Sequence, residues 1–246
     1  MSSVSVIIPT RDRPEYLAEA LESVRRQTHP ELELLLVRDG GPPFPNEIGV
    51  LLARFDFPVI LLEHDDVSGG AARSRNWALT RARGDVIAFL DDDDTWEPGH
   101  AAAVAGALAA HPEADVVYAD SVILNVATDG TRTLARDFDS GRFVRDGFIP
   151  PSSMAARRVA FERFGEFDPD FTLTEDWEWL IRVVRAGGVV RRVPGATATI
   201  RIHGGGLSAL DGSRLEERRR TLALLAERYA LEPIEPKTFW EVAAAT

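Results

Sequence analysis

Short apolar runs alternate with segments of helical spacing through the first 110 residues, and no other feature limits the possible folds as strongly. The apolar runs are Val4 to Ile8, Leu32 to Val37, Pro58 to Leu62 and Val86 to Leu90. The helical segments are Pro14 to Gln27, Ala71 to Arg81 and His100 to Ala110. Strands and helices in this order are joined by right-handed crossovers and form a mostly parallel sheet flanked by helices. We therefore expect an α/β fold.

The spacing changes after a further apolar run, Asp115 to Ala119. Asp129-Gly130 lies between two β-prone runs, which predicts a hairpin and a smaller antiparallel region. The later helices and strands are expected at Arg158 to Phe164, Glu175 to Ala186, Val189 to Val193, Ala198 to Ile202 and Ser213 to Tyr229. Because no repeat or linker interrupts the chain, we expect one domain over 1–246, with parts at 1–120, 121–212 and 213–246.

Composition excludes several classes of function. The 246 residues carry a formal net charge of −11, which disfavours nucleic acid as a partner because phosphate binding depends on Lys and Arg. The chain has no cysteine, so disulfides and thiolate metal sites are excluded. No run is apolar enough over about 18 residues to span a membrane, and no leader is recognised. We expect a cytoplasmic protein, and the sequence is compatible with peripheral membrane contact and with a homo-oligomer.

Four consecutive aspartates, Asp91 to Asp94, follow the fourth apolar run directly. In such a sheet, ligands bind outside the carboxyl ends of the strands. Adjacent carboxylates repel one another, and a divalent cation would relieve the repulsion. Alternate residues of an extended chain point the same way, so Asp91 and Asp93 would face one ligand. Their hard oxygens favour Mg²⁺ or Mn²⁺, although a solvated acidic turn is the other interpretation.

Other polar residues occupy similar positions, but each also has an ordinary structural explanation. Thr10 and Arg11 follow the first apolar run, and Asp39 follows the second, where Asp-Gly is common turn chemistry. Arg73, Arg75 and Asn76 lie on a predicted helix that follows Ser68-Gly69-Gly70, where phosphate binding and a capped helix with surface arginines are both plausible.

The start of the helix predicted from Glu175 allows two interpretations. Thr172 and Glu175 fit a capping box, which would make Glu175 and Asp176 part of an ordinary helix terminus. In the functional interpretation, one of the two carboxylates is a general base that faces a cleft. His203 follows a late strand and precedes three glycines, so it is either a metal or phosphate ligand or a histidine with no such role.

The order of these segments resembles the inverting family 2 glycosyltransferases of the GT-A fold, from about Val4 to His203. The matching segments are Val4 to Arg13, Leu34 to Gly41, Ala72 to Asn76, Ala88 to Asp94, Thr174 to Trp177 and Arg201 to His203. They are similar to that family's opening strand, Asp-Asp-Gly-Ser element, Ala-Arg-Asn helix, DXD segment, Glu-Asp motif and late Arg-x-His. Two departures concern the site: Arg38 replaces an acidic residue, and the run of four aspartates leaves two possible registers for the DXD segment.

The resemblance implies a role for each candidate residue. Those it assigns to the nucleotide sugar are Pro9, Thr10, Arg11, Asp39, Arg73, Asn76, Asp91 and Asp92. It assigns the base of the nucleotide to Asp39, and it assigns Mn²⁺ or Mg²⁺ to Asp93, Asp91 and His203. Asp176 would be the general base, with Glu175 beside it. Residues 1–120 would then form a donor half, 121–212 an acceptor and catalytic half, and 213–246 a C-terminal helical tail.

The expected reaction is inverting, metal-dependent transfer of one sugar from a nucleoside-diphosphate sugar, with UDP- or dTDP-sugars favoured, to a hydroxyl acceptor. Single transfer is expected because the Gln-x-x-Arg-Trp signature of processive synthases is absent. One rival is a haloacid dehalogenase-like phosphatase that uses Asp91 and Asp93, since Asp91-x-Asp93-x-Thr95 fits its motif. That family usually has its motif near the first strand and a lysine in the core, whereas the only lysine here is Lys237. The other rival is a non-enzymatic metal- or sugar-binding module.

Overall fold

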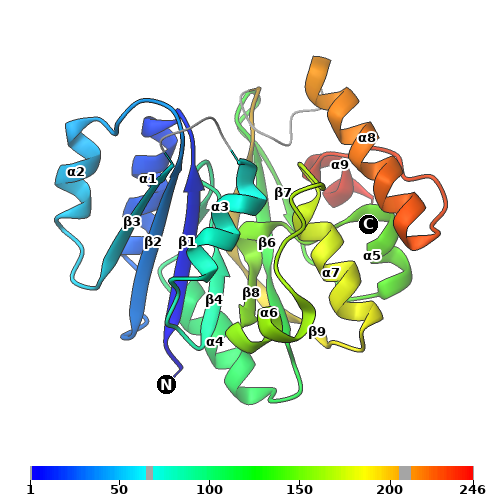
Figure 1. The fold of residues 1–246 in the computed structure, drawn as a ribbon, viewed down its shortest axis with the longest axis horizontal. Coiled ribbons are helices and arrows are strands. Elements are labelled where there is room, and N and C mark those ends of the chain that lie inside the picture. The colour runs from blue at the N-terminus through cyan, green and yellow to red at the C-terminus, as the bar shows by residue number, and fades with distance from the viewer. Residues whose placement is uncertain (1, 65–68, 205–211, 246) are drawn as a thin grey trace.

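The computed structural model describes residues 2–64, 69–204 and 212–245. The elements of its first half are β1 (Val4–Thr10), α1 (Pro14–Arg25), β2 (Leu32–Asp39), α2 (Asn46–Leu52), β3 (Val59–His64), α3 (Gly70–Leu79) and β4 (Val86–Phe89). The four strands lie side by side in the order β3-β2-β1-β4 and are all parallel (Figure 1). β1, β2 and β4 are buried almost throughout, as expected for parallel strands covered on both faces.

The second half adds strands to the same sheet. Its elements are β5 (Thr95–Trp96), α4 (His100–Ala110), β6 (Val116–Asn125), β7 (Gly130–Leu134), α5 (Ser140–Asp146), η1 (Pro151–Ser153), β8 (Met154–Arg157), α6 (Arg158–Phe164), α7 (Glu175–Arg185), β9 (Val190–Ile202), α8 (Gly212–Tyr229) and α9 (Phe239–Ala244). The sheet continues from β4 in the order β8-β6-β9-β5, and β7 pairs with β6. β8 is antiparallel to both β4 and β6, so it joins the parallel half to the rest.

Two predictions about the second half were wrong in detail. The expected strand Asp115 to Ala119 and the first arm of the hairpin are one strand, β6, and Asp129 makes the turn with a positive φ of 53°. The two late strands are likewise one strand, β9, in spite of Pro194-Gly195. The pairing of β6 with β9 shifts register around Asp120, whose carboxylate accepts from the backbone N–H of Gly195 at 3.0 Å. The irregularity is thus absorbed as a bulge without ending the strand.

Helices cover both faces of the sheet, and Figure 1 shows α3, α6 and α7 on the near face. α3 packs on β1 and β2, α6 on β8, and α4 on β6 and β9. A cluster of aromatic side chains fills the core between the near helices and β4. Phe161 stacks on Trp179 at 4.5 Å between ring centroids, and Phe89 meets Phe167 edge to face at 5.3 Å. Trp179 is therefore a core residue.

Of the two C-terminal helices, α9 packs on the second half of the sheet and α8 packs on α7. α9 contacts β6 and β7, and Arg136 donates to the carbonyls of Val242 and Ala245 at the C-terminal end of this helix. Where α8 lies against α7, the Tyr229 hydroxyl donates to Glu178 Oε1 at 2.5 Å. Among the described residues, no helix is both long enough and apolar enough to cross a membrane.

Candidate active site

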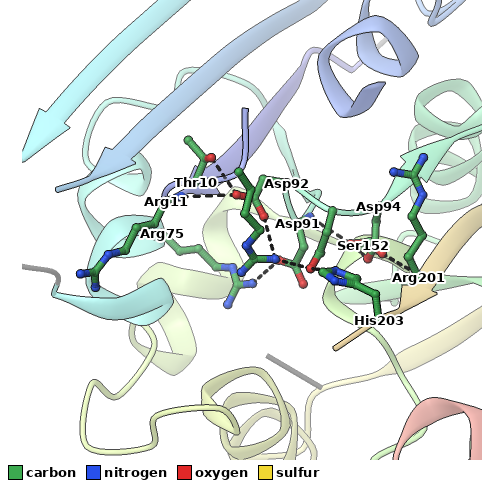
Figure 2. Close-up of polar contacts among 11 residues, drawn as sticks. Thr10, Arg11, Arg75, Asp91, Asp92, Asp94, Ser152, Arg201 and His203 are labelled. Atoms are coloured by element: carbon green, nitrogen blue, oxygen red, sulfur yellow. Dashed lines mark hydrogen bonds and ion pairs between the residues drawn. The ribbon is translucent and has the colours of Figure 1, made fainter. Parts of the chain in front are cut away.

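The four aspartates after β4 bind four different sets of partners, because the chain turns where the sequence analysis expected it to be extended. The backbone N–H of Asp94 donates to the carbonyl of Asp91 at 3.1 Å, which closes the turn. Asp92 is 4% exposed and accepts from Thr10 Oγ1 at 2.7 Å (Figure 2). Asp93 accepts from Arg13 and lies 3.0 Å from His203 Nε2. The four aspartates therefore do not alternate between opposite faces, as residues of the predicted extended chain would.

Asp94 is a structural member of the run. It accepts from Ser152 Oγ at 2.6 Å and from the backbone N–H of Arg201 at 2.9 Å (Figure 2). Ser152 Oγ also accepts a hydrogen bond from the backbone N–H of Asp91 at 3.0 Å. Burial raises the pKa of Asp94 well above its usual range, and the charges of Asp93 and Asp91 add to the effect. Asp94 thus joins the end of β4 to η1 and β9, although it also borders the cleft with Asp91, Asp92 and Asp93.

Burial also separates the acidities of the other aspartates. It raises the pKa of Asp92 to about 6, although the charge of Arg13 opposes the change. It would raise the pKa of Asp93 as well, but the hydrogen bond to His203 and the charge of Arg13 lower it below its usual value. Arg13 is therefore the counter-charge of Asp92 and Asp93.

Arg75 is the counter-charge of the other side, and it links the acidic run to α7. Its side chain is 3% exposed, and it donates to Asp91 Oδ1 at 2.6 Å and to Glu175 Oε1 at 2.5 Å. The guanidinium lies over the rings of Phe89 and Phe167, at 5.9 and 5.8 Å from their centroids. Burial alone would lower the pKa of Arg75, but the surrounding carboxylates raise it above its ordinary value. Arg75 remains charged and holds Asp91 and Glu175 at fixed positions.

The capping-box interpretation of the start of α7 was wrong. The helix begins at Glu175 with Thr174 as its N-cap, and no side chain caps it. The Glu175 carboxylate instead binds Arg75 across 100 residues of sequence. Burial raises the pKa of Asp176 to about 7, with a contribution from Glu175, while Arg75 and Arg218 oppose the shift. The side chains of Glu175 and Asp176 do not line the cleft at the end of β4. Arg75 connects Glu175 to Asp91, which does line it.

A cleft of about 600 Å³ lies over the carboxyl ends of β1, β2 and β4. The residues predicted for the site that line it are Pro9, Thr10, Arg11, Asp39, Asp91, Asp92, Asp93 and His203. Asp39 accepts from the backbone N–H groups of Gly69 and Gly70 at 3.0 and 3.1 Å, and these bonds fix it at the start of α3. Arg38, which replaces an acidic residue of the motif, binds Glu63 at 2.8 Å and the carbonyl of Gly41 at 2.7 Å.

Two more predicted residues, Arg73 and Asn76, lie outside the cleft wall, as Glu175 and Asp176 do. Arg73 is on the exposed face of α3. Asn76 uses its side-chain amide on the backbone of Phe167, donating at 2.8 Å and accepting at 3.0 Å. The structure therefore gives Asn76 a role in joining α3 to the segment before α7, and its predicted contact with a nucleotide stays a prediction.

His203 is held between Asp93 and an aromatic ring that the sequence analysis did not select. Tyr16 of α1 stacks on His203 with centroids 4.6 Å apart, and the guanidinium of Arg201 lies 5.4 Å from the same ring. The sequence analysis also assigned no role to Arg13, and only the fold reveals its position. Arg75 did carry a signal, because it lies three residues from Ala72 and from Ala78, both on the buried face of α3.

The residues fit a hard divalent cation only if a substrate supplies further ligands. Asp93 and His203 are adjacent oxygen and nitrogen donors, and Asp91 lines the same cleft. In the described ranges, no group of three or more His, Cys, Asp or Glu side chains is arranged to hold a metal ion. Mg²⁺ is often held by one or two carboxylates together with phosphate oxygens, and this pair suits such a site.

Comparison with known proteins identifies the family. The model described as Glycosyl transferase family 2 matches residues 5–161. The chain is 30% identical to the uncharacterized glycosyltransferase YwdF of Bacillus subtilis over 96% of this chain and 87% of that protein. The fold is similar to that of S. aureus TarS 1-349 in complex with UDP-GlcNAc, with a TM-score of 0.75, 19% identity, and coverage of 95% of this chain and 68% of that one.

A second structural neighbour is the mannosyltransferase PcManGT from Pyrobaculum calidifontis in complex with GDP-Man and Mn²⁺. Its TM-score is 0.69 at 19% identity, with coverage of 99% of this chain and 68% of that one. The predicted fold class is confirmed, and neither the phosphatase nor the non-enzymatic binding module is favoured. Because the family model covers more than half of the sequence, the chain belongs to glycosyl transferase family 2 and is a glycosyltransferase.

Proposed function

We propose that the chain transfers a single sugar from a nucleoside-diphosphate sugar to a hydroxyl acceptor, with inversion at the anomeric carbon and Asp176 as the general base. The observation that carries the proposal is the chain of contacts from the cleft to α7. Asp91 lines the cleft, Arg75 binds both Asp91 and Glu175, and Asp176 follows Glu175. A single buried arginine thus connects the wall of the cleft to the candidate base.

The donor half, residues 1–120, would bind the nucleotide. Asp39 lies in the cleft with its carboxylate fixed by two backbone N–H groups, so it can accept a hydrogen bond from a base edge. Pro9, Thr10 and Arg11 line the neighbouring wall. TarS 1-349 and PcManGT, which share the fold, are complexed with UDP-GlcNAc and GDP-Man, and this supports a nucleotide sugar as the donor class.

The chemistry of Asp176 supports its role as base. Efficient proton transfer needs a group whose pKa lies near the working pH, and burial raises the pKa of Asp176 to about 7. Glu175 is committed to Arg75, so Asp176 is the member of the pair that would accept the proton of the acceptor hydroxyl. Catalytic contacts often tighten only when substrates are bound, which is compatible with a base outside the cleft wall in this state.

Mn²⁺ or Mg²⁺ would be held by Asp93 and His203, with Asp91 as the further candidate. When bound, the cation would neutralise charge on the departing nucleoside diphosphate. Contacts within the chain would orient the two side chains that hold it, because Tyr16 stacks on His203 and Arg13 binds Asp93. The presence of Mn²⁺ with PcManGT supports this cofactor class.

The acceptor would bind on the opposite side of the cleft, in the half formed by residues 121–212. Pro150, Pro151 and Ile200 form an apolar part of the wall there. The C-terminal tail, 213–246, adds Phe239 and Arg214 to the same cleft. A hydroxyl acceptor with an apolar face suits these neighbours, and we propose that the enzyme acts in the cytoplasm.

A thermal-shift screen with UDP-, dTDP- and GDP-sugars, each with and without Mn²⁺, tests the donor and the cation together. A ligand that binds only the folded state raises its stability by about 2.7 kcal/mol at 100 times its Kd. We expect one nucleotide class to stabilise the chain, and more strongly with Mn²⁺. No response to any of the donors would refute the proposed donor class.

The variant Asp176→Asn tests the base. We expect transfer to fall about 10² to 10⁴-fold while calorimetry shows unchanged donor affinity. Asp170→Asn, at an exposed position in the segment before α7, is the matched control and should keep full activity. Near-normal turnover of Asp176→Asn would show that another group accepts the proton.

A further inference from the structure

The C-terminal helix α8 places a partly buried arginine, Arg218, against the turn that leads into Glu175 and Asp176. Arg218 donates from Nη1 to the carbonyl of Leu173, two residues before the start of α7. Leu173 has a positive φ of 66°, a conformation that leucine rarely adopts and that surrounding contacts must maintain. The hydrogen bond from Arg218 to the Leu173 carbonyl directly restrains this turn.

Two further contacts hold α8 against the same segment. The Tyr229 hydroxyl donates to Glu178 Oε1 at 2.5 Å, one helical turn beyond the carboxylate pair. Arg228 binds Asp168 and lies over the ring of Phe171 at 4.4 Å. The position of Arg218 is therefore fixed by contacts at the other end of its helix, and it does not depend on the bond to Leu173 alone.

The charge of Arg218 acts on the same carboxylates. The charged groups that influence Asp176 are Glu175 in α7, Arg75 in α3 and Arg218 in α8. Glu175 raises the pKa of Asp176, whereas the two arginines lower it. Burial lowers the pKa of Arg218 itself, and the charges of Asp176 and Glu175 oppose that change. In the described part of the chain, its Nε has no hydrogen-bond partner, so its interaction with the carboxylates is mainly one of charge.

We propose that Arg218 is a positioning residue for the Glu175–Asp176 pair: it fixes the strained turn at Leu173 and holds its positive charge close to the two carboxylates. The proposal rests on the role of Asp176 put forward above. It assigns part of the active site to α8, which lies beyond the 5–161 matched by the family model. Arg75 and Arg218 would then hold the pair from opposite ends of the sequence.

The first test measures the acidity of Asp176 directly and needs no substrate. Carboxyl-¹³C aspartate is incorporated, the Asp176 signal is assigned by its loss in Asp176→Asn, and its titration is followed by NMR. In Arg218→Met the pKa should rise by about one unit, at the low end of the effect of a nearby opposite charge. Arg218→Lys, which keeps the charge, should restore most of the difference. Arg219→Met is the control, because the Arg219 side chain is 57% exposed and pairs with Glu216 on the same helix.

The second test is the pH profile of nucleoside diphosphate release from the donor that stabilises the chain, UDP-N-acetylglucosamine or GDP-mannose. The acid limb for Arg218→Met should move up by about one pH unit, with about a five-fold loss of kcat at pH 7 that recovers by about pH 9. A general packing defect would lower the rate at every pH. Circular dichroism and the thermal midpoint establish that each variant is folded.

An unchanged Asp176 titration in folded Arg218→Met would overturn the proposal, whatever the activity. A shift equal to that of Arg219→Met would do the same. If the titration moves as expected but Asp176→Asn keeps normal turnover, Arg218 still sets the acidity of Asp176, and the failure belongs to the base assignment. The two ideas can therefore fail separately.

Discussion

Replacement of Arg75 by methionine should expose how strongly the active site depends on one buried cation. The guanidinium pairs with Asp91, whose side chain is 31% exposed, and with Glu175, whose side chain is 7% exposed. Methionine keeps an aliphatic stem against Phe89 and Phe167 but leaves Glu175 buried without its partner. Removal of one member of a buried ion pair costs about 3 to 5 kcal/mol, and the exposure of Asp91 means that Glu175 accounts for most of it.

The cost should depend on pH in a defined direction. A buried carboxylate without a counter-charge is unfavourable only while it is ionised. The loss in free energy of unfolding caused by Arg75→Met should therefore be largest near pH 8 and smaller toward pH 5, as carboxyl groups take up protons. The double variant Arg75→Met/Glu175→Gln removes both charges, and it should recover much of the lost stability at pH 8.

Urea unfolding, followed by tryptophan fluorescence at pH 5 and pH 8, measures these differences. At pH 8 the midpoint of Arg75→Met should lie about 1 to 2 M urea below that of the parent. Arg73→Met, on the exposed face of the same helix, should stay within about 0.5 kcal/mol of it. Equal costs for the two variants, or a cost for Arg75→Met that is the same at both pH values, would refute the reasoning.

Four further predictions concern acidity, packing and the cation. Because the raised pKa of Asp176 is about 7 and a base must be deprotonated, the transfer rate should rise with pH through about 7, as a pH–rate profile would show. Burial raises the pKa of Asp92 from its ordinary value of 3.8 to about 6, so the stability contributed by its neutral carboxyl is fully present below pH 3.8 and is lost as pH rises through 6. Asp92→Asn should thus stabilise the chain at pH 8 by up to about 3 kcal/mol, but not at pH 3, by urea unfolding. Gly147→Ala should cost about 2 kcal/mol, measured in the same way, because Gly147 has a φ of 52° and a Cβ there would lie 2.6 Å from the Trp177 ring. Asp93→Ala should abolish any effect of Mn²⁺ on donor affinity by calorimetry, and an unchanged effect would assign the cation to other residues.

Local patterns were sufficient for the alternating half of the fold. The helices His100–Ala110 and Arg158–Phe164 have the bounds expected from their spacing, and the first four strands are in place. This is because apolar periodicity and the residues at helix ends act over one or two turns. β8 was missed, since four residues paired with strands on either side carry little pattern of their own.

The candidate site divides in the same way. The sequence placed polar residues after β1, β2 and β4, and the parallel order of these strands was enough to bring Thr10, Asp39 and Asp91 to one cleft. It did not distinguish the registers within Asp91 to Asp94, because that choice depends on side chains far along the chain. Ser152, from a segment 58 residues away, binds Asp94 and commits it to the structure.

The amino-acid sequence by itself determined the first four strands, their parallel direction and the edge of the sheet at which carboxylates gather, since these follow from hydrophobic periodicity. Only the tertiary structure decided which charges meet. Arg75 binds Glu175 across 100 residues, and Arg218 binds Leu173 across 45, separations at which no local pattern carries information. The strand that ends in four aspartates is thus predictable from the sequence. The positions of Arg75 and Arg218, whose charges act on the pKa of Asp176 in α7, depend instead on how helices distant in sequence pack together.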